Sequence, residues 1–154
     1  MKKLLLVFLV MVISISSIFA QNKTSQFIKE TFPKVHEVIV NDALKLYPGE
    51  YVIQRNEIDN QCSSFSVYIL LILVDEPKKI SKETLDKIQG EALIKWAKNP
   101  NINNAPCINY STADKDIIND LDCKLAYMKV NWIQVLLTMG ESFEEIGVDK
   151  SILQ

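Results

Sequence analysis

The feature that most constrains this chain is an uninterrupted apolar run of ten residues, FSVYILLILV, at Phe65–Val74. A helix needs about 20 residues to cross a bilayer, so the run has to be buried within its own protein. Apolar side chains that continue it upstream recur at intervals of four and three, which is the spacing of one helix face: Ile58, Cys62, Phe65, Ile69 and Ile72. This spacing predicts a central helix from about Glu50 to Val74. The alternative is an α+β fold with a hairpin at about 50–75, because Val, Tyr and Ile also favour strands.

The first 20 residues have the features of a secretory signal peptide. Lys2 and Lys3 give a positive start, an apolar stretch follows, and Ala20 is a small residue at which cleavage is expected. Ile18 is larger than the residue usual two places before that site, which leaves an uncleaved anchor as the alternative. Removing 20 of the 154 residues leaves 134, enough for one core. We therefore expect residues 21–154 to form a single domain of a secreted or periplasmic protein.

The charge of the chain argues against two classes of partner. Its formal net charge is −2, and loss of Lys2 and Lys3 with the leader changes this to −4. Nucleic acids and anionic membrane surfaces attract basic proteins. We expect neither as a partner of the mature chain.

Two further segments have helical periodicity and clear ends. The first begins near Thr24, bends near Phe32 because the next residue is proline, and ends at Leu46. The second begins after Ser81, a residue type that caps helix N-termini, and runs to about Ala97. Both predict helices that flank the central one.

The last helix has the most regular pattern in the chain. It opens at Ser111, and its apolar residues alternate at spacings of three and four up to Gly140, a residue typical of helix ends: Ile118, Leu121, Leu125, Met128, Trp132, Val135 and Met139. Residues 141–147 are expected as one more short helix. With the three helices before it, this pattern predicts an all-α fold, an up-down four-helix bundle with a long loop before the last helix.

That long loop is the candidate binding segment. Residues 98–110, KNPNINNAPCINY, are rich in Asn and contain two Pro and no helical period. Long ordered loops carry binding residues more often than short ones do. We take Asn101, Asn103, Asn104 and Cys107 as the candidate binding residues.

Three cysteines predict one disulfide and one free thiol in an oxidising compartment. If the central helix begins near Glu50, Cys62 and Cys123 both lie about 18 Å along helices that start from the same end of the bundle. Cys62–Cys123 is then the expected bridge. If the helix begins only at Asp59, Cys62 lies near the long loop, and Cys62–Cys107 becomes the pair.

Residues that support catalysis are sparse. There is one histidine, His36, and only four glycines, with no G-x-S-x-G motif and no phosphate-binding loop. A Cys and His36 pair as a nucleophile has no local motif to support it. Three Cys and one His lack the C-x₂-C spacing of a zinc site. We expect no cofactor, no metal and no enzyme activity.

Two functions fit a small secreted helical protein. The leading hypothesis is a protein-binding module, such as an inhibitor or immunity-type partner of a secreted enzyme. The alternative is a carrier of a small apolar ligand, held between helices in a cavity lined by Phe65, Tyr68, Met128 and Trp132.

Overall fold

The structure, a computed structural model, describes residues 18–72, 80–107 and 114–149. Within these ranges the chain is all-α and contains no strand, so the predicted fold class is confirmed and the α+β alternative is wrong. The four-helix bundle is not confirmed, because these ranges hold six α-helices and a short 3₁₀ helix: α2 (Ile18–Thr31), α3 (Pro33–Leu46), α4 (Tyr51–Ile72), α5 (Lys82–Trp96), η1 (Ile102–Asn104), α6 (Asp114–Met128) and α7 (Trp132–Glu145).

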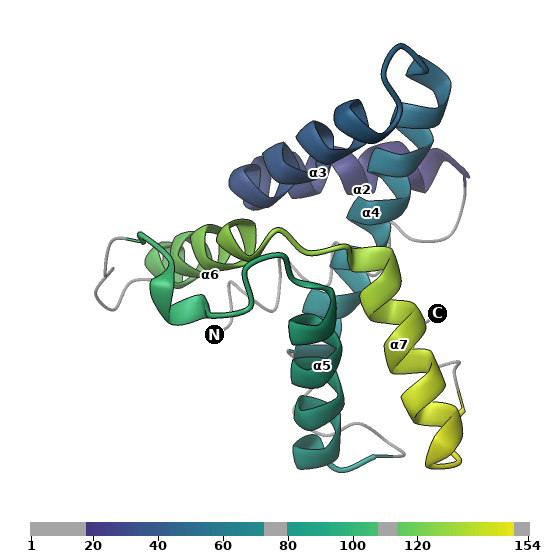
Figure 1. Cartoon of the computed structure of the whole chain (residues 1–154), viewed down its shortest axis with the longest axis vertical. Coiled ribbons are helices and arrows are strands. Elements are labelled where there is room, and N and C mark those ends of the chain that lie inside the picture. The colour runs from purple at the N-terminus through teal and green to yellow at the C-terminus, as the bar shows by residue number, and fades with distance from the viewer. Residues whose placement is uncertain (1–17, 73–79, 108–113, 150–154) are drawn as a thin grey trace.

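The longest helix, α4, is the element around which the others are arranged. It contacts α2, α3 and α7, while α5 lies beside α7 and α6 contacts α3 (Figure 1). Cys62, Phe65 and Ile69 of the predicted central seam are fully or almost fully buried. The apolar run that begins at Phe65 is therefore the centre of the core as far as Ile72, and the last two residues of the run lie outside the described ranges.

The core continues through a chain of aromatic rings. Phe32 of α2–α3 meets Phe65 edge to face at 5.1 Å between ring centroids, and Phe65 lies 4.7 Å from Trp132. Trp132 in turn lies 5.3 Å from Tyr68. These contacts link the N-terminal helices to α7 through α4. Within the described ranges, none of the helices combines the length and the apolarity that a membrane crossing needs.

The predicted bend near Phe32 is confirmed as the boundary between α2 and α3. Phe32 leaves helical geometry, with φ at −128°, and Pro33 begins α3. Phe32 supplies no side-chain cap for α3. Instead Asp122 of α6 accepts hydrogen bonds from the backbone N–H groups of Lys34, at 3.1 Å, and Val35, at 2.9 Å. A side chain from α6 therefore holds the N-terminus of α3.

The prediction of one continuous last helix is wrong, because the chain turns between α6 and α7. Lys129 has a positive φ of 52°, and the Asn131 side chain caps α7 by accepting a hydrogen bond from the N–H of Gln134 at 3.2 Å. Gln61 of α4 also accepts a hydrogen bond from the N–H of Trp132 at 2.8 Å. These bonds hold the start of α7 on α4, so α7 runs in a different direction from α6 (Figure 1).

Two further predictions for the C-terminal helices, the helix end at Gly140 and a separate short helix at 141–147, are also wrong. Gly140 is buried inside α7 and does not end it. The helix continues to Glu145, so the short helix expected at 141–147 is the last part of α7. Gly147, with φ at +72°, follows its end. The expected start at Ser111 lies outside the described ranges.

The disulfide joins Cys107 to Cys123, whose Cα atoms are 5.9 Å apart. The predicted bridge Cys62–Cys123 and its alternative Cys62–Cys107 are both wrong. Cys62 is free and buried, and its thiol forms a hydrogen bond with Ser25 of α2. The prediction failed because it assumed that the segment holding Cys123 runs alongside α4 in a bundle, whereas α6 lies against α3 and η1.

Candidate functional site

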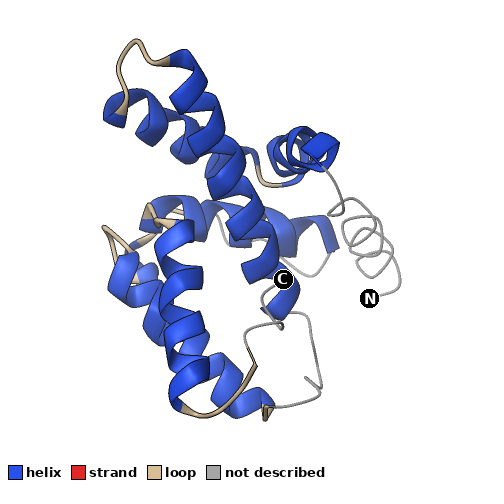
Figure 2. Cartoon of the chain, turned by 90° about the vertical axis from the view of Figure 1, so that its right-hand side faces the viewer, coloured by secondary structure: helices blue, strands red, loops and turns tan. Residues whose placement is uncertain are grey.

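The hairpin formed by α3 and α4 projects from the rest of the molecule (Figures 1 and 2). Its end carries exposed apolar side chains. Leu46 is 61% exposed, Tyr51 80%, Val52 75% and Ile53 45%. We call these four residues the apolar tip. Leu46 is the last residue of α3, and the other three are the first residues of α4. This end of the hairpin extends beyond the helices that cover the rest of it. Exposed apolar residues gathered in this way mark interaction surfaces more often than scattered ones do.

Hydrogen bonds close the turn that carries the apolar tip. The amide of Gln54, which is buried, donates a hydrogen bond to the carbonyl oxygen of Tyr47 at 2.6 Å. The N–H of Glu50 donates to the same oxygen at 3.1 Å. Gly49 adopts φ of +82°, a conformation that suits glycine and disfavours other residues. The tip therefore needs little ordering before it meets a partner.

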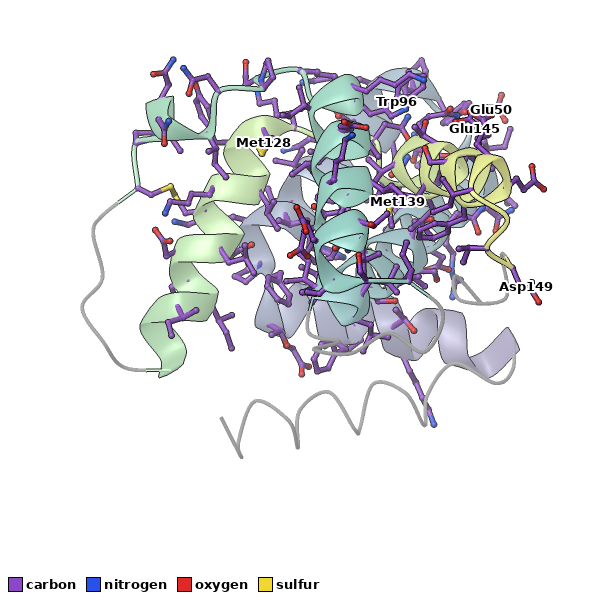
Figure 3. All side chains as sticks on the ribbon, turned by 90° about the horizontal axis from the view of Figure 1, so that it is seen from below. Glu50, Trp96, Met128, Met139, Glu145 and Asp149 are labelled. Carbon is purple, nitrogen blue, oxygen red and sulfur yellow. A yellow bond between two sulfur atoms is a disulfide. The ribbon has the colours of Figure 1, made fainter. Side chains whose placement is uncertain are left out.

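A cleft lies along one side of the same hairpin, where the C-terminal half of α3 and the N-terminal half of α4 meet the end of α5 and the joint between α6 and α7. Its volume is about 260 Å³. The backbones of Ala97 and Val130 pair there as an isolated antiparallel bridge. Trp96, at the C-terminal end of α5 (Figure 3), forms part of the wall. The cleft is lined by Ile39, Asp42, Ala43, Lys45, Leu46, Glu57, Gln61, Trp96, Lys98, Lys129, Val130 and Asn131.

The charged residues of the cleft differ in their partners. Lys98 forms an ion pair with Asp42 at 2.9 Å, and Glu57 accepts a hydrogen bond from the Gln61 amide at 2.8 Å. Within the described part of the chain, the structure gives Lys45 and Lys129 no ion pair. The cleft thus combines apolar walls with three lysines and two acidic residues, in a chain whose net charge is negative.

A shallower groove on the hairpin contains the only histidine. The Nε2 atom of His36 lies 3.5 Å from the Ser25 hydroxyl. Partial burial, and then the charge of Lys29, lower the pKa of His36, which favours the neutral imidazole at neutral pH. Asp59 also lines this groove, and burial raises the pKa of its carboxyl group against the opposing effect of Arg55.

The groove does not supply an activated thiol. Burial raises the pKa of Cys62 to about 11, so the thiol stays protonated at neutral pH. The side chain of Cys62 is also fully buried. The arrangement therefore gives no support to the hypothesis of a Cys and His36 nucleophile.

The four residues predicted to bind a partner lie together in one segment, apart from the apolar tip (Figure 1). Asn101 caps η1 through a hydrogen bond from the N–H of Asn103 at 3.2 Å, and Asn103 and Asn104 are exposed. Cys107 is half-buried and bonded to Cys123, which ties the segment to α6. The side chains of these Asn residues are therefore accessible to a partner. The sulfur of Cys107 is not, because it forms the disulfide.

The residues predicted to line an apolar ligand cavity are part of the packed core. Phe65, Tyr68, Met128 and Trp132 are buried, and three of them form ring contacts with one another. Neither the cleft nor the groove is lined by any of them. Within the described ranges, no group of three or more His, Cys, Asp or Glu side chains is placed to hold a metal ion.

Sequence reasoning missed both the apolar tip and the cleft. The available signal for the tip was the apolar triplet Tyr51-Val52-Ile53 directly after a Pro-Gly turn. Comparisons of the chain with protein-family models, with curated proteins and with solved structures find no match.

Proposed function

We propose that this chain is a protein-binding module and that the apolar tip is its docking surface. The observation that carries the proposal is the exposure of Leu46, Tyr51, Val52 and Ile53 at the end of a projecting hairpin whose turn is closed by hydrogen bonds. Large aromatic and aliphatic side chains dominate the binding energy of protein interfaces once a partner removes them from water. Burying such a tip in a partner would remove apolar surface from water with little loss of conformational freedom.

The shape of the tip favours one kind of partner. A convex apolar surface fits a concave one, and the clefts of enzymes are concave and largely apolar. Lys45, Glu50 and Arg55 are exposed around the tip, and the surroundings therefore carry charges of both signs. We propose a secreted protein with an apolar cleft as the partner, for example an enzyme whose activity changes on this contact.

The test compares apolar residues at the tip with apolar residues exposed elsewhere. Tyr51→Asp and Val52→Asp place charges in the proposed interface, whereas Ile94→Asp on α5 and Leu137→Asp on α7 change residues with 58% and 56% exposure outside it. All four substitutions lie at exposed positions and should change the free energy of unfolding by only about 0.5 kcal/mol. A partner recovered with the wild-type chain should be lost with the first pair and kept with the second. Equal retention by all four variants would remove the proposal.

The Asn-rich segment is a separate candidate surface for the same function. A triple variant with alanine at Asn101, Asn103 and Asn104 removes its exposed amides, at the cost of one cap on η1. If this variant lost partner binding while Tyr51→Asp kept it, the docking surface would be the Asn-rich segment and not the tip. We expect the opposite pattern.

A further inference from the structure

The cleft along the side of the α3–α4 hairpin has the size of a site for one small molecule or one side chain. Its volume is about 260 Å³, and an apolar cavity of about 150 Å³ already holds benzene. Ile39, Ala43 and Val130 give it apolar walls, and the ring of Trp96 forms one side. The cleft therefore has room for an aromatic ring or a short aliphatic chain together with a polar group.

The walls of the cleft are fixed without a ligand. The N–H of Asn131 donates to the carbonyl oxygen of Trp96 at 3.3 Å, and the N–H of Asn99 donates to that of Met128 at 3.1 Å. The indole N–H of Trp96 donates to the hydroxyl of Thr138 at 2.7 Å, which orients the ring. Because this N–H is already bonded, Trp96 can meet a ligand only through its ring, and the Lys95 ammonium lies 5.5 Å from the centroid over one face of that ring.

The polar groups of the cleft favour an anion. Its two carboxylates are already engaged by Lys98 and by the amide of Gln61. In the part of the chain that the structure describes, the ammonium groups of Lys45 and Lys129 have no such partner. A cationic ligand would have to displace Lys98 or Gln61 from its carboxylate, whereas for an anionic ligand the cleft offers two lysines with no ion pair to break.

We infer that this cleft binds an apolar carboxylate, with its apolar body against Trp96 and its carboxylate group toward Lys45 and Lys129. Two sources have this chemistry, a free organic acid and the C-terminal residue of a peptide. The inference does not depend on docking of the apolar tip, although Leu46 belongs to both the tip and the cleft.

The experiment titrates the full chain with phenylacetate and with a short peptide ending in a free phenylalanine carboxylate. The neutral controls are phenylacetamide and the same peptide with an amidated end. The readout is the NMR signal of the indole N–H of Trp96, with that of Trp132 as an internal reference because Trp132 is buried in the core. We expect saturable shifts at Trp96 with a carboxylate and none with its neutral control. Binding of phenylacetate identifies a free acid as a sufficient ligand, and binding of the peptide alone identifies a chain end.

Three charge-neutralising variants locate the carboxylate. Lys45→Gln and Lys129→Gln should each weaken binding by about fivefold, because each removes one partly screened charge-assisted contact. Lys87→Gln removes a charge of the same kind from the exposed face of α5 and should leave the affinity unchanged. Added salt should weaken binding to the wild-type chain.

Three results would overturn the inference. The first is equal affinity for phenylacetate and phenylacetamide, and the second is an equal effect of Lys87→Gln and the two cleft variants. The third is the absence of a shift at Trp96 with either carboxylate at millimolar concentration. None of these results bears on partner binding by Tyr51→Asp, so failure here is distinguishable from failure of the proposed function.

Discussion

Replacing Asp122 by alanine tests whether α6 holds the N-terminus of α3. Asp122 lies in α6, is only 2% exposed, and accepts hydrogen bonds from two backbone N–H groups in the first turn of α3. Its negative charge also lies at the positive end of that helix. Because Phe32 provides no side-chain cap, Asp122→Ala leaves both N–H groups without the acceptor that they use in the folded protein.

The expected cost follows from those two hydrogen bonds. A lost helix cap costs about 1 kcal/mol, and each buried donor without a partner about 1–3 kcal/mol. Burial raises the pKa of Asp122 because its carboxylate is desolvated. This desolvation offsets part of the stability that the two hydrogen bonds give the wild-type chain. We therefore expect Asp122→Ala to lower the free energy of unfolding by about 2–3 kcal/mol. For a chain of this size, the midpoint of thermal unfolding should fall by about 5–10 °C.

The assay is urea unfolding followed by far-ultraviolet circular dichroism, with Asp86→Ala as the matched control. Asp86 is exposed and forms an ion pair with Lys82 at 2.9 Å, a surface interaction that is worth at most about 1 kcal/mol. A loss of stability in Asp122→Ala no larger than that in Asp86→Ala would refute the reasoning that α6 caps α3.

Acid titration gives a second test of the same residue. Burial raises the pKa of Asp122 in the folded protein above its ordinary value of 3.8, while hydrogen bonds from Val35 and Lys34 and the charge of Lys34 oppose the rise. Between the ordinary and the raised pKa the folded state binds more protons than the unfolded state, so the contribution of Asp122 to stability falls as the pH rises through this window. The advantage of the wild type over Asp122→Asn should therefore be larger below pH 3.8 than at neutral pH. An advantage that grew as the pH rose would contradict the stated effect of burial.

Three further predictions follow from the cysteines and from Gln61. Replacing Cys107 and Cys123 together by serine should cost about 3 kcal/mol, because the disulfide closes a loop across a sequence separation of 16 residues; an unchanged denaturation midpoint would contradict this. Cys62 should resist thiol reagents in the folded chain, since it is buried with a pKa of about 11. After unfolding without reductant one thiol should react, and mass spectrometry counts the labels. Gln61→Leu should cost about 2 kcal/mol in urea unfolding, because it leaves the N–H of Trp132 without its acceptor, and a neutral effect would show that α7 does not depend on this bond.

Local signals in the sequence were sufficient for several helix boundaries. Ser81 caps α5 by accepting a hydrogen bond from the N–H of Thr84 at 3.2 Å, as its residue type predicts. Proline at position 33 separates α2 from α3 because it lacks the N–H that a helix interior requires. The apolar spacing in the central segment identified α4 as a buried helix. Each of these features depends on residues close together in the chain.

The turn between α6 and α7 could not be found in the same way. No glycine or proline marks it, and the three-and-four spacing continues through it because Met128 and Trp132 are buried in the same core. The break depends on a left-handed residue at Lys129, on the cap at Asn131 and on Gln61, which is distant in sequence. The disulfide prediction failed for a related reason, since it required the direction of the segment that contains Cys123.

The candidate sites depended even more on tertiary structure. Tyr51, Val52 and Ile53 are apolar, and the sequence alone gives such residues no reason to be exposed. Their exposure follows from the length of the α3–α4 hairpin relative to the helices that cover it. The cleft likewise combines residues from α3, α4, the end of α5 and the joint between α6 and α7. The long Asn-rich segment was recognisable from composition, but its partner cysteine was not.

The most direct test of the proposed function is photo-crosslinking from the apolar tip. A photoreactive aromatic amino acid replaces Tyr51 in one variant of the full chain and Leu137 in another, and both are exposed to the proteins of the chain's own compartment. We predict one discrete crosslinked protein from position 51, none from position 137, and loss of that adduct when Val52→Asp is added. The recovered protein should have an apolar cleft, and the chain should change its activity. The same adducts from both positions, or an adduct unaffected by Val52→Asp, would contradict the assignment of the tip as a docking surface.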